Sequence, residues 1–315
     1  MSIPSIDLKD FHNPSKKSHF IAELGKAFNE IGFVAVKNHG LSDASSATLY
    51  KSFQNFFSLP DDVKSKYDIP NGAGQRGYTG KRKETAKGFK APDLKEFYHI
   101  GQENKPLEKE LLVDYPDNIF PNEVPTLQNI GVEVFKILEK AGIDLLQAIA
   151  LYLNLPEHYF DAKVDTGNSV LRCIHYYPIE KPDAIEPDAV RAAAHEDINL
   201  ITLLMGASAD GLQIQKNDGS WIAVTALPDQ IVVNVGDMLA RLTNNKLKST
   251  THRVVNPPKE LMHLPRFSMP FFMHPRSDMD LSCLESCVDD SHPKIYSNIT
   301  AGAYLDERLR ELGLK

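Results

Sequence analysis

The chain has 315 residues, of which 42% are hydrophobic and 24% are charged, so a sizeable core is expected and disorder is not. Its net charge of -7 opposes a nucleic-acid binder, which needs clustered Lys and Arg for phosphates. No run approaches the roughly 20 apolar residues that span a bilayer, and no secretory leader is visible. We therefore expect a cytoplasmic protein without a membrane or nucleic-acid partner.

The three cysteines are an odd number in a long chain, which argues against a disulfide framework and for a reducing compartment. Cys283 and Cys287 lack the further partners that a four-ligand metal site needs. We expect Cys173, Cys283 and Cys287 to be incidental or buried thiols.

The first half of the chain predicts helices joined by short strands and one long loop. Ser18 is a suitable cap for the first helix, and Ile130, Val134, Ile137 and Leu138 share one face of the longest helix. The predicted elements are a helix over 18–31, a strand within 32–40, a helix over 43–57, a loop over 70–92, a strand over 95–101 and a helix over 126–153.

The second half changes to short strands with turn signals between them. Asp218-Gly219 predicts a hairpin turn. The strands are expected within 169–178, 198–205, 211–225, 230–239, 249–256 and 265–274, and the tail returns to helix over 299–312. This spacing of strands indicates a β-sandwich, barrel or jelly roll.

Three polar residues stand out in these strands as candidate metal ligands. His195 and Asp197 head the apolar segment "HEDINLITLL", and alternate residues of a strand project to one face. His252, on its own predicted strand, supplies a third ligand. Two imidazoles and one carboxylate leave open positions on an octahedral metal, which is the arrangement of non-haem Fe(II) oxygenases.

Arg266 and Ser268 are a second pair of candidates, on the next apolar strand. Alternation puts both on one face and Phe267 on the other. A guanidinium facing an apolar interior is costly unless it meets an anion, and its planar fork fits a carboxylate. These residues therefore predict a carboxylate-binding site near the metal.

With these motifs the chain resembles the isopenicillin N synthase-like branch of the Fe(II)/2-oxoglutarate-dependent dioxygenases. The HxD...H triad is His195, Asp197 and His252, and the RxS motif is Arg266 and Ser268. Further likeness lies in "IPSIDL", "GFVAVKNHG", "DLKEFYHIG", "YYP" and "GDMLARLTNNKLKSTTHRV".

The resemblance implies a mainly β fold with flanking helices, a cupin-like jelly roll (double-stranded β-helix). It implies an N-terminal helix and strand region, 1–100, packed on a catalytic domain, 101–315. Its cofactors would be Fe(II), O2 and the co-substrate 2-oxoglutarate, with ascorbate as a reductant. A small molecule would be oxidised at an unactivated C–H bond by hydroxylation, desaturation or ring closure, with release of succinate and CO2.

The resemblance also implies roles for single residues. Arg266 and Ser268 would bind the far carboxylate of 2-oxoglutarate. Tyr176 or Tyr177 would contact the co-substrate or the substrate. The family often has Asn before this pair of tyrosines where this chain has His175, so the residues leave open which tyrosine faces the site.

Three other functions stay open at this point. The chain can be an oxidase that uses Fe(II) and O2 without 2-oxoglutarate, with the RxS pair holding a substrate carboxylate. It can also be a non-catalytic metal or metabolite-binding module. A zinc hydrolase is a third option, although no HExxH-type glutamate base stands beside the histidines.

The segment from Gln75 to Lys90 is rich in basic residues, with Glu84 as its single acid. Such runs are usually solvated loop surfaces. If this loop instead covers the active site, it favours an acidic small-molecule substrate. The basic residues are Arg76, Lys81, Arg82, Lys83, Lys87 and Lys90. The oligomeric state is left open by the sequence.

Overall fold

The structure, a computed structural model, describes residues 3–315 except 71, 87, 187, 207–209, 225, 226 and 228. The helices are α1 (Leu8–Phe11), α2 (Lys17–Glu30), α3 (Asp43–Phe57), α4 (Asp61–Lys64), α5 (Thr126–Tyr152), α6 (Asp161–Val164), α7 (Asp237–Leu242) and α8 (Ala301–Glu311). The strands are β1 (Ser5–Asp7), β2 (Phe33–Lys37), β3 (Gly77–Thr79), β4 (Glu96–Gly101), β5 (Val170–Tyr176), β6 (Ala192–His195), β7 (Ile201–Met205), β8 (Leu212–Gln215), β9 (Trp221–Ala223), β10 (Gln230–Val235), β11 (His252–Val254) and β12 (Arg266–Met273).

The strands form two sheets that face each other. The larger sheet has the order β1-β2-β10-β7-β12-β5-β4-β3, and the smaller has the order β6-β11-β8-β9. All pairs are antiparallel except β1 with β2. One apolar cluster joins the sheets, with Phe33, Ile174 and Val232 from the larger sheet and Ile214 and Val254 from the smaller one. This two-sheet arrangement is the expected jelly roll, or double-stranded β-helix.

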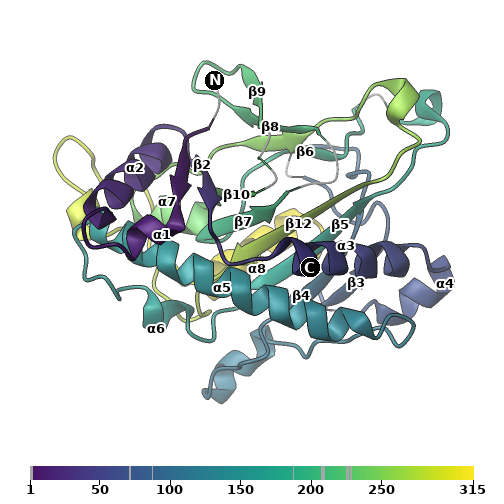
Figure 1. Cartoon of the computed structure of the whole chain (residues 1–315), viewed down its shortest axis with the longest axis horizontal. Helices are drawn as coiled ribbons and strands as arrows, with labels where there is room; N and C mark the ends of the chain where they lie inside the picture. The colour runs from purple at the N-terminus through teal and green to yellow at the C-terminus, as the bar shows by residue number, and fades with distance from the viewer. Residues whose placement is uncertain are drawn as a thin grey trace.

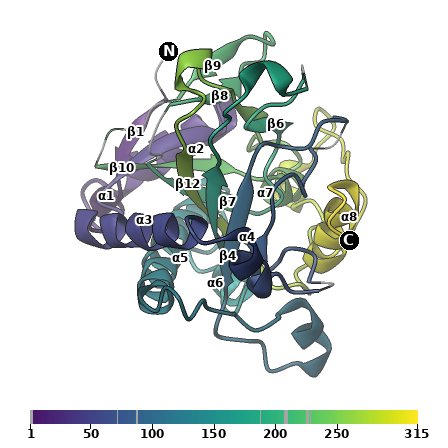
Figure 2. The ribbon, with the colours of Figure 1, turned by 90° about the vertical axis from the view of Figure 1, so that its right-hand side faces the viewer.

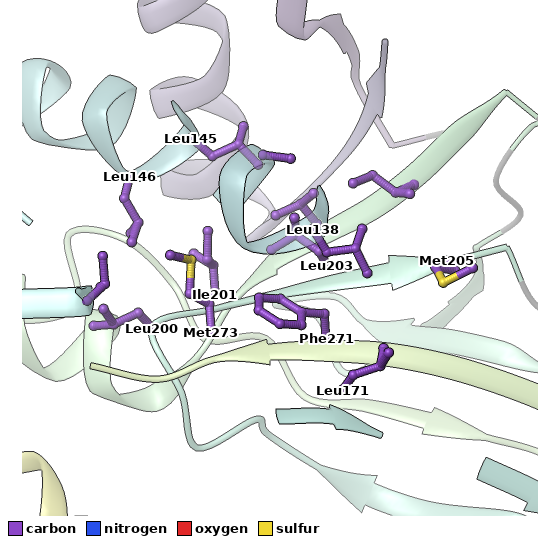
Figure 3. Packing of buried hydrophobic residues seen from close by; sticks show 14 of the residues in the cluster. Leu138, Leu145, Leu146, Leu171, Leu200, Ile201, Leu203, Met205, Phe271 and Met273 are labelled. Carbon is purple, nitrogen blue, oxygen red and sulfur yellow. The ribbon is translucent and has the colours of Figure 1, made fainter. Parts of the chain in front are cut away.

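The long helix α5 lies across the outer face of the larger sheet and is flanked there by α2 and α3 (Figure 1). Figure 3 shows the packing between them, where leucines of α5 meet apolar side chains of β5, β7 and β12. Alternate residues of these strands face α5, while the residues between them face the other sheet. The outer face therefore carries the main core, and the inner face is left for a site.

Glycine permits this close approach of α5 to the sheet. A Cβ added at Gly142 would lie 2.4 Å from Met273 Sδ, and one added at Gly131 would lie 2.3 Å from Ile100 Cδ1. Both distances are shorter than real carbon contacts, so larger residues would push the helix outward.

Most expected elements are present, and two differ. Lys16 precedes α2 and no side chain caps this helix, so the cap expected at Ser18 is wrong. The loop expected over 70–92 contains β3, which pairs with β4. A strand of three residues is too short to show an alternating pattern. It begins at Gly77, whose φ is 69°, and glycine in a sequence indicates a turn.

The hairpin predicted at Asp218-Gly219 is confirmed, because β8 and β9 pair across residues 216–220. No helix in the described part of the chain is long and apolar enough to cross a membrane. The division into 1–100 and 101–315 stays a prediction, although strands from both ranges share the larger sheet.

Candidate active site

His195, Asp197 and His252 converge at one end of the smaller sheet. β6 ends at His195, β11 begins at His252, and these two residues are direct partners in the antiparallel register. The Nε2 atoms of His195 and His252 lie 4.0 and 3.8 Å from Asp197 Oδ1. One ligand atom from each residue lies within 4.8 Å of the others, so a single metal ion can be held by all three.

Hydrogen bonds fix both histidines in the tautomer that a metal requires. His195 Nδ1 donates to the Ala193 carbonyl (2.7 Å), and His252 Nδ1 donates to the Thr250 carbonyl (3.1 Å). Because a carbonyl only accepts, the ring proton is on Nδ1 in both rings, and the Nε2 lone pairs are free for a metal.

Asp197 is oriented in the same way. Its Oδ2 accepts hydrogen bonds from Thr202 Oγ1 (2.6 Å) and Asn234 Nδ2 (2.8 Å), and Asn199 Nδ2 donates to the Thr202 hydroxyl (2.8 Å). Oδ1, the atom nearest to the histidines, is left for the metal. The donor set therefore fits a divalent metal ion with its supporting groups in place.

The local backbone differs from the expected strand in one respect. His195 is the last residue of β6, Asp197 lies in the turn that follows, and β7 starts only at Ile201. The two side chains therefore do not share a strand face through alternation. The turn brings Asp197 to the metal side, where its backbone carbonyl accepts from Asp237 N (2.7 Å) at the start of α7.

A small cavity of about 60 Å³ lies between the two sheets beside the triad. It is lined by all three triad residues and by Arg266, Ser268 and Tyr176. Arg266 is only 1% exposed, its Nε donates to the Asp210 carbonyl (3.1 Å), and its guanidinium lies 5.0 Å from the centre of the Tyr176 ring. The structure thus brings the RxS motif next to the HxD...H triad.

The register between β5 and β12 determines which side chains enter this cavity. Arg266 is opposite Tyr176, and Phe267 is opposite His175. Directly opposed residues share a face, so Arg266 and Tyr176 face the cavity, while Phe267 and His175 stack on the other side with ring centres 4.8 Å apart. Tyr177 lies beyond the strand, in a separate apolar cluster, with Lys81 Nζ 5.6 Å from its ring centre.

A larger cavity of about 420 Å³ lies in front of the triad. Helix α8 closes one side of it through Leu305, Arg308 and Leu309, together with Leu312 directly after the helix. Figure 2 shows α8 in yellow on the same side of the molecule as α7, and Tyr304 OH of α8 donates to Asp237 of α7 (3.2 Å). Five residues line both cavities: Lys95, Arg172, His195, Asp197 and Phe272.

Three buried ion pairs form one wall of the larger cavity. Lys95 Nζ lies 2.6 Å from Glu84 and 2.7 Å from Asp93, and Arg172 Nη1 lies 3.2 Å from Glu84. Burial alone would raise the pKa of Glu84, but the Arg172 and Lys95 cations outweigh it and hold this pKa below its usual value. Burial likewise opposes the charge of Lys95, yet the two carboxylates raise the pKa of this amine. Glu84 and Lys95 are therefore both ionised.

None of the described cations of the basic segment after Gln75 lines this cavity. Arg76 is buried elsewhere, where it donates to the Gln75 carbonyl and to Asn168 Oδ1. Lys81 and Arg82 are exposed. Lys81 pairs with Asp61, and Arg82 pairs with Glu186. Lys83 and Lys90 are exposed as well, and Lys87 lies outside the described residues. From this segment the cavity receives Gln75, Glu84 and Ala86.

Sequence reasoning missed Thr202, Asn234 and the ion pairs of the larger cavity. A polar residue in the otherwise apolar run "IVVNV" was a usable signal for Asn234. Asp93, Lys95 and Arg172 carried none, because they come from segments far apart in the sequence.

Two family models match the chain. Residues 3–126 match the "non-haem dioxygenase in morphine synthesis N-terminal" family, and residues 167–275 match the "2OG-Fe(II) oxygenase superfamily". A 2-oxoglutarate-dependent dioxygenase, frbA, of Dothideomycetidae sp. is 30% identical over 98% of this chain and 96% of its own length.

Solved structures agree with these matches. A 2OG-Fe(II) oxygenase family protein from Caulobacter crescentus is 41% identical over 98% of both chains, with a TM-score of 0.86. A Neurospora crassa protein in complex with alpha-KG and thymine is 30% identical over 98% of this chain and 96% of that chain, with a TM-score of 0.85. JOX2 in complex with 2OG, Fe and JA is 27% identical over 99% of this chain and 86% of that chain, with a TM-score of 0.79.

The fold and the His-Asp-His site define a non-haem iron oxygenase. The chain belongs to the 2-oxoglutarate- and Fe(II)-dependent oxygenases, which confirms the family expected from its motifs.

Proposed function

We propose that this protein oxidises an unactivated C–H bond of a small molecule with O2 and 2-oxoglutarate, and releases succinate and CO2. One observation carries the proposal: a single cavity is lined by the three metal-ligating side chains and by Arg266, Ser268 and Tyr176. The neighbouring 420 Å³ cavity has the size of a small-molecule site and shares five lining residues with it.

His195 Nε2, Asp197 Oδ1 and His252 Nε2 would hold Fe(II). When bound, the ion supplies the activation of O2 that is coupled to oxidative decarboxylation of 2-oxoglutarate. The protein's contribution is to fix the ligands: Ala193 and Thr250 set the histidine tautomers, and the hydrogen bonds to Asp197 Oδ2 turn its other oxygen to the metal.

Arg266 would bind the far carboxylate of 2-oxoglutarate through its planar fork, and the Ser268 hydroxyl would add a hydrogen bond. Tyr176 forms the wall against which this guanidinium lies, so we assign it, rather than Tyr177, to the co-substrate site. The mostly buried surroundings exclude water and so strengthen these charged contacts.

Among relatives, the Neurospora crassa protein binds thymine and JOX2 binds JA, each with 2-oxoglutarate, so the proposed substrate is a small molecule. The basic segment 75–90 would favour an acidic substrate only if it covered the active site, and neither Arg76 nor Lys81 lines the cavity. We also propose a cytoplasmic location, which the free thiols of Cys173, Cys283 and Cys287 support.

The test is a panel of small molecules, thymine included, scored for succinate above the substrate-free rate with Fe(II), ascorbate and 2-oxoglutarate. The proposal expects succinate formation that requires 2-oxoglutarate. O2 uptake that proceeds at the full rate without 2-oxoglutarate would instead support an oxidase of the isopenicillin N synthase type. A chain that binds metal and consumes neither O2 nor 2-oxoglutarate would be a binding module.

A further inference from the structure

Arg172 is the basic side chain that the substrate cavity and the co-substrate cavity share on β5. It lies four residues before Tyr176, and alternation along β5 puts Arg172, Ile174 and Tyr176 on the same inner face. Because it lines both cavities together with His195 and Asp197, its guanidinium lies where a substrate must approach the metal.

Neighbouring groups hold this guanidinium in one orientation. Its Nε donates to His99 Nε2 (2.6 Å), its Nη1 lies 3.2 Å from Glu84, and its centre lies 4.2 and 5.1 Å from the ring centres of Phe97 and Phe272. Within the described part of the chain, Nη2 has no hydrogen-bond partner, and it is not enclosed by protein atoms. An oriented donor is therefore left for a molecule in the cavity.

The charges around the cavity are already balanced on this wall. Lys95 is paired with Asp93 and Glu84, and Arg172 is paired with Glu84. At the opposite side, Arg308 is paired with Glu307 and Glu311 at 2.9 Å each. Among the described residues, the lining has six carboxyl residues and three basic residues: Glu84, Asp93, Glu196, Asp197, Asp237 and Glu311 against Lys95, Arg172 and Arg308.

We propose that Arg172 binds the substrate through Nη2, and that the substrate is an uncharged small molecule with a carbonyl or similar oxygen acceptor. This inference rests on the proposed function, since it names the substrate class of the same cavity. A substrate carboxylate would have to compete with Glu84, Asp93 or Glu311 for the cation that each already pairs with. It would also enter a lining in which the described carboxyl groups outnumber the described cations. A cation would be repelled by Arg172 and by the metal beside it.

Part of the cavity lining is apolar and fits a molecule that has an apolar body. Phe272 offers a partly exposed aromatic ring next to Arg172, and the apolar side chains of Val170, Ile198, Leu305 and Leu309 belong to the same lining. Aromatic and aliphatic side chains of this kind are typical of the walls of small-molecule sites.

The test compares three molecules on one ring: benzamide, benzoate and benzylamine. Each is titrated into the nickel- and 2-oxoglutarate-loaded full chain, and binding is followed by ligand-observed NMR. We expect benzamide to bind at least ten times more tightly than either charged form. Arg172→Met should remove this preference, whereas Lys81→Met, which removes a cation outside the cavity, should leave it unchanged.

Glu84→Gln tests the charge balance, because it should strengthen the binding of benzoate relative to benzamide. A misfolded chain could not show such a gain. The substitution frees Arg172 from its carboxylate, while Lys95 keeps Asp93. The ratio of benzoate to benzamide affinity should then rise at least tenfold. An equal or stronger binding of benzoate by the unaltered chain, or no preference for benzamide, would overturn the inference.

Succinate formation by the iron-loaded enzyme without these molecules is measured in parallel. Its absence counts against the proposed function itself. The order of the three affinities decides only the charge class of the substrate.

Discussion

His195 and His252 face each other across neighbouring antiparallel strands, with ring centres 4.4 Å apart. At this distance a positive charge on one imidazole disfavours protonation of the other, whereas both rings can bind the same metal ion. The pKa of His195 agrees with this, because burial, with His252 close by, lowers it to about 4. The pairing of β6 with β11 is thus what makes two residues from separate segments of the chain one metal site.

The hydrogen bond from Thr202 to Asp197 Oδ2 should control metal affinity. We expect Thr202→Val to weaken metal binding by roughly 10- to 100-fold, because Asp197 loses one of the donors that orient it. Competition with a chelator measures this affinity. Thr243→Val is the matched control, since Thr243 is also buried and hydrogen-bonded but serves the backbone of α7 and the residues after it. Equal affinity of the Thr202 variant and the parent chain would contradict this role of Thr202.

Arg266 should set the affinity for 2-oxoglutarate. We expect Arg266→Lys to raise the KM for 2-oxoglutarate at least about tenfold, because the ammonium keeps the charge but loses the planar fork. Initial rates of succinate formation over a range of 2-oxoglutarate concentrations measure the KM. Arg276→Lys should not change it, because Arg276 pairs with Asp278 and Glu108 near the surface. A rise in both variants would point to a general loss of structure.

His274 should make the protein less stable as the pH falls. Burial lowers the pKa of this side chain from 6.5 to about 4. Between these values the unfolded chain binds a proton that the folded chain does not, so the free energy of unfolding rises with pH in this window. The contribution is at most about 3 kcal/mol at pH 7 and is lost as the pH falls from 6.5 towards 4.

Urea unfolding at about pH 4.5 and at about pH 7 samples the inside of this window and a pH above it. The free energy of unfolding should differ less between these two pH values in His274→Gln than in the parent chain. His292→Gln changes an exposed histidine and should leave the difference unaltered. If the His274 variant kept the pH dependence of the parent chain, His274 would not be a source of that dependence.

The contact between α5 and the larger sheet should supply much of the stability. Leu203→Ala should cost about 2–5 kcal/mol, because Leu203 is fully buried beneath α5 and its loss leaves a cavity (Figure 3). Leu107→Ala removes the same atoms from a side chain that is 95% exposed, and its effect should stay within about 0.5 kcal/mol. Urea unfolding of both variants compares them directly, and similar losses would be evidence against this location of the core.

The sequence alone predicted the candidate metal ligands and the RxS pair because HxD and RxS are local patterns, although Asp197 lies beyond the strand that ends at His195. His252 and Arg266 each lie in a strand, as expected. The choice of Tyr176 over Tyr177 required the register with β12, which no local pattern contains. The wall made by Glu84, Lys95 and Arg172 was also invisible, because tertiary structure alone brings these residues together.

The most direct measurement of the central claim follows succinate and 2-oxoglutarate together in the iron-loaded enzyme. The three ligands and Arg266 are predicted to work as one site, so the parent chain should form one succinate for each 2-oxoglutarate consumed, and only with O2 and Fe(II) present. Asp197→Ala should lose this activity at least about 100-fold together with its bound iron, because one of three ligands is removed. Full activity of Asp197→Ala, or no consumption of 2-oxoglutarate by the iron-loaded parent chain, would contradict the account.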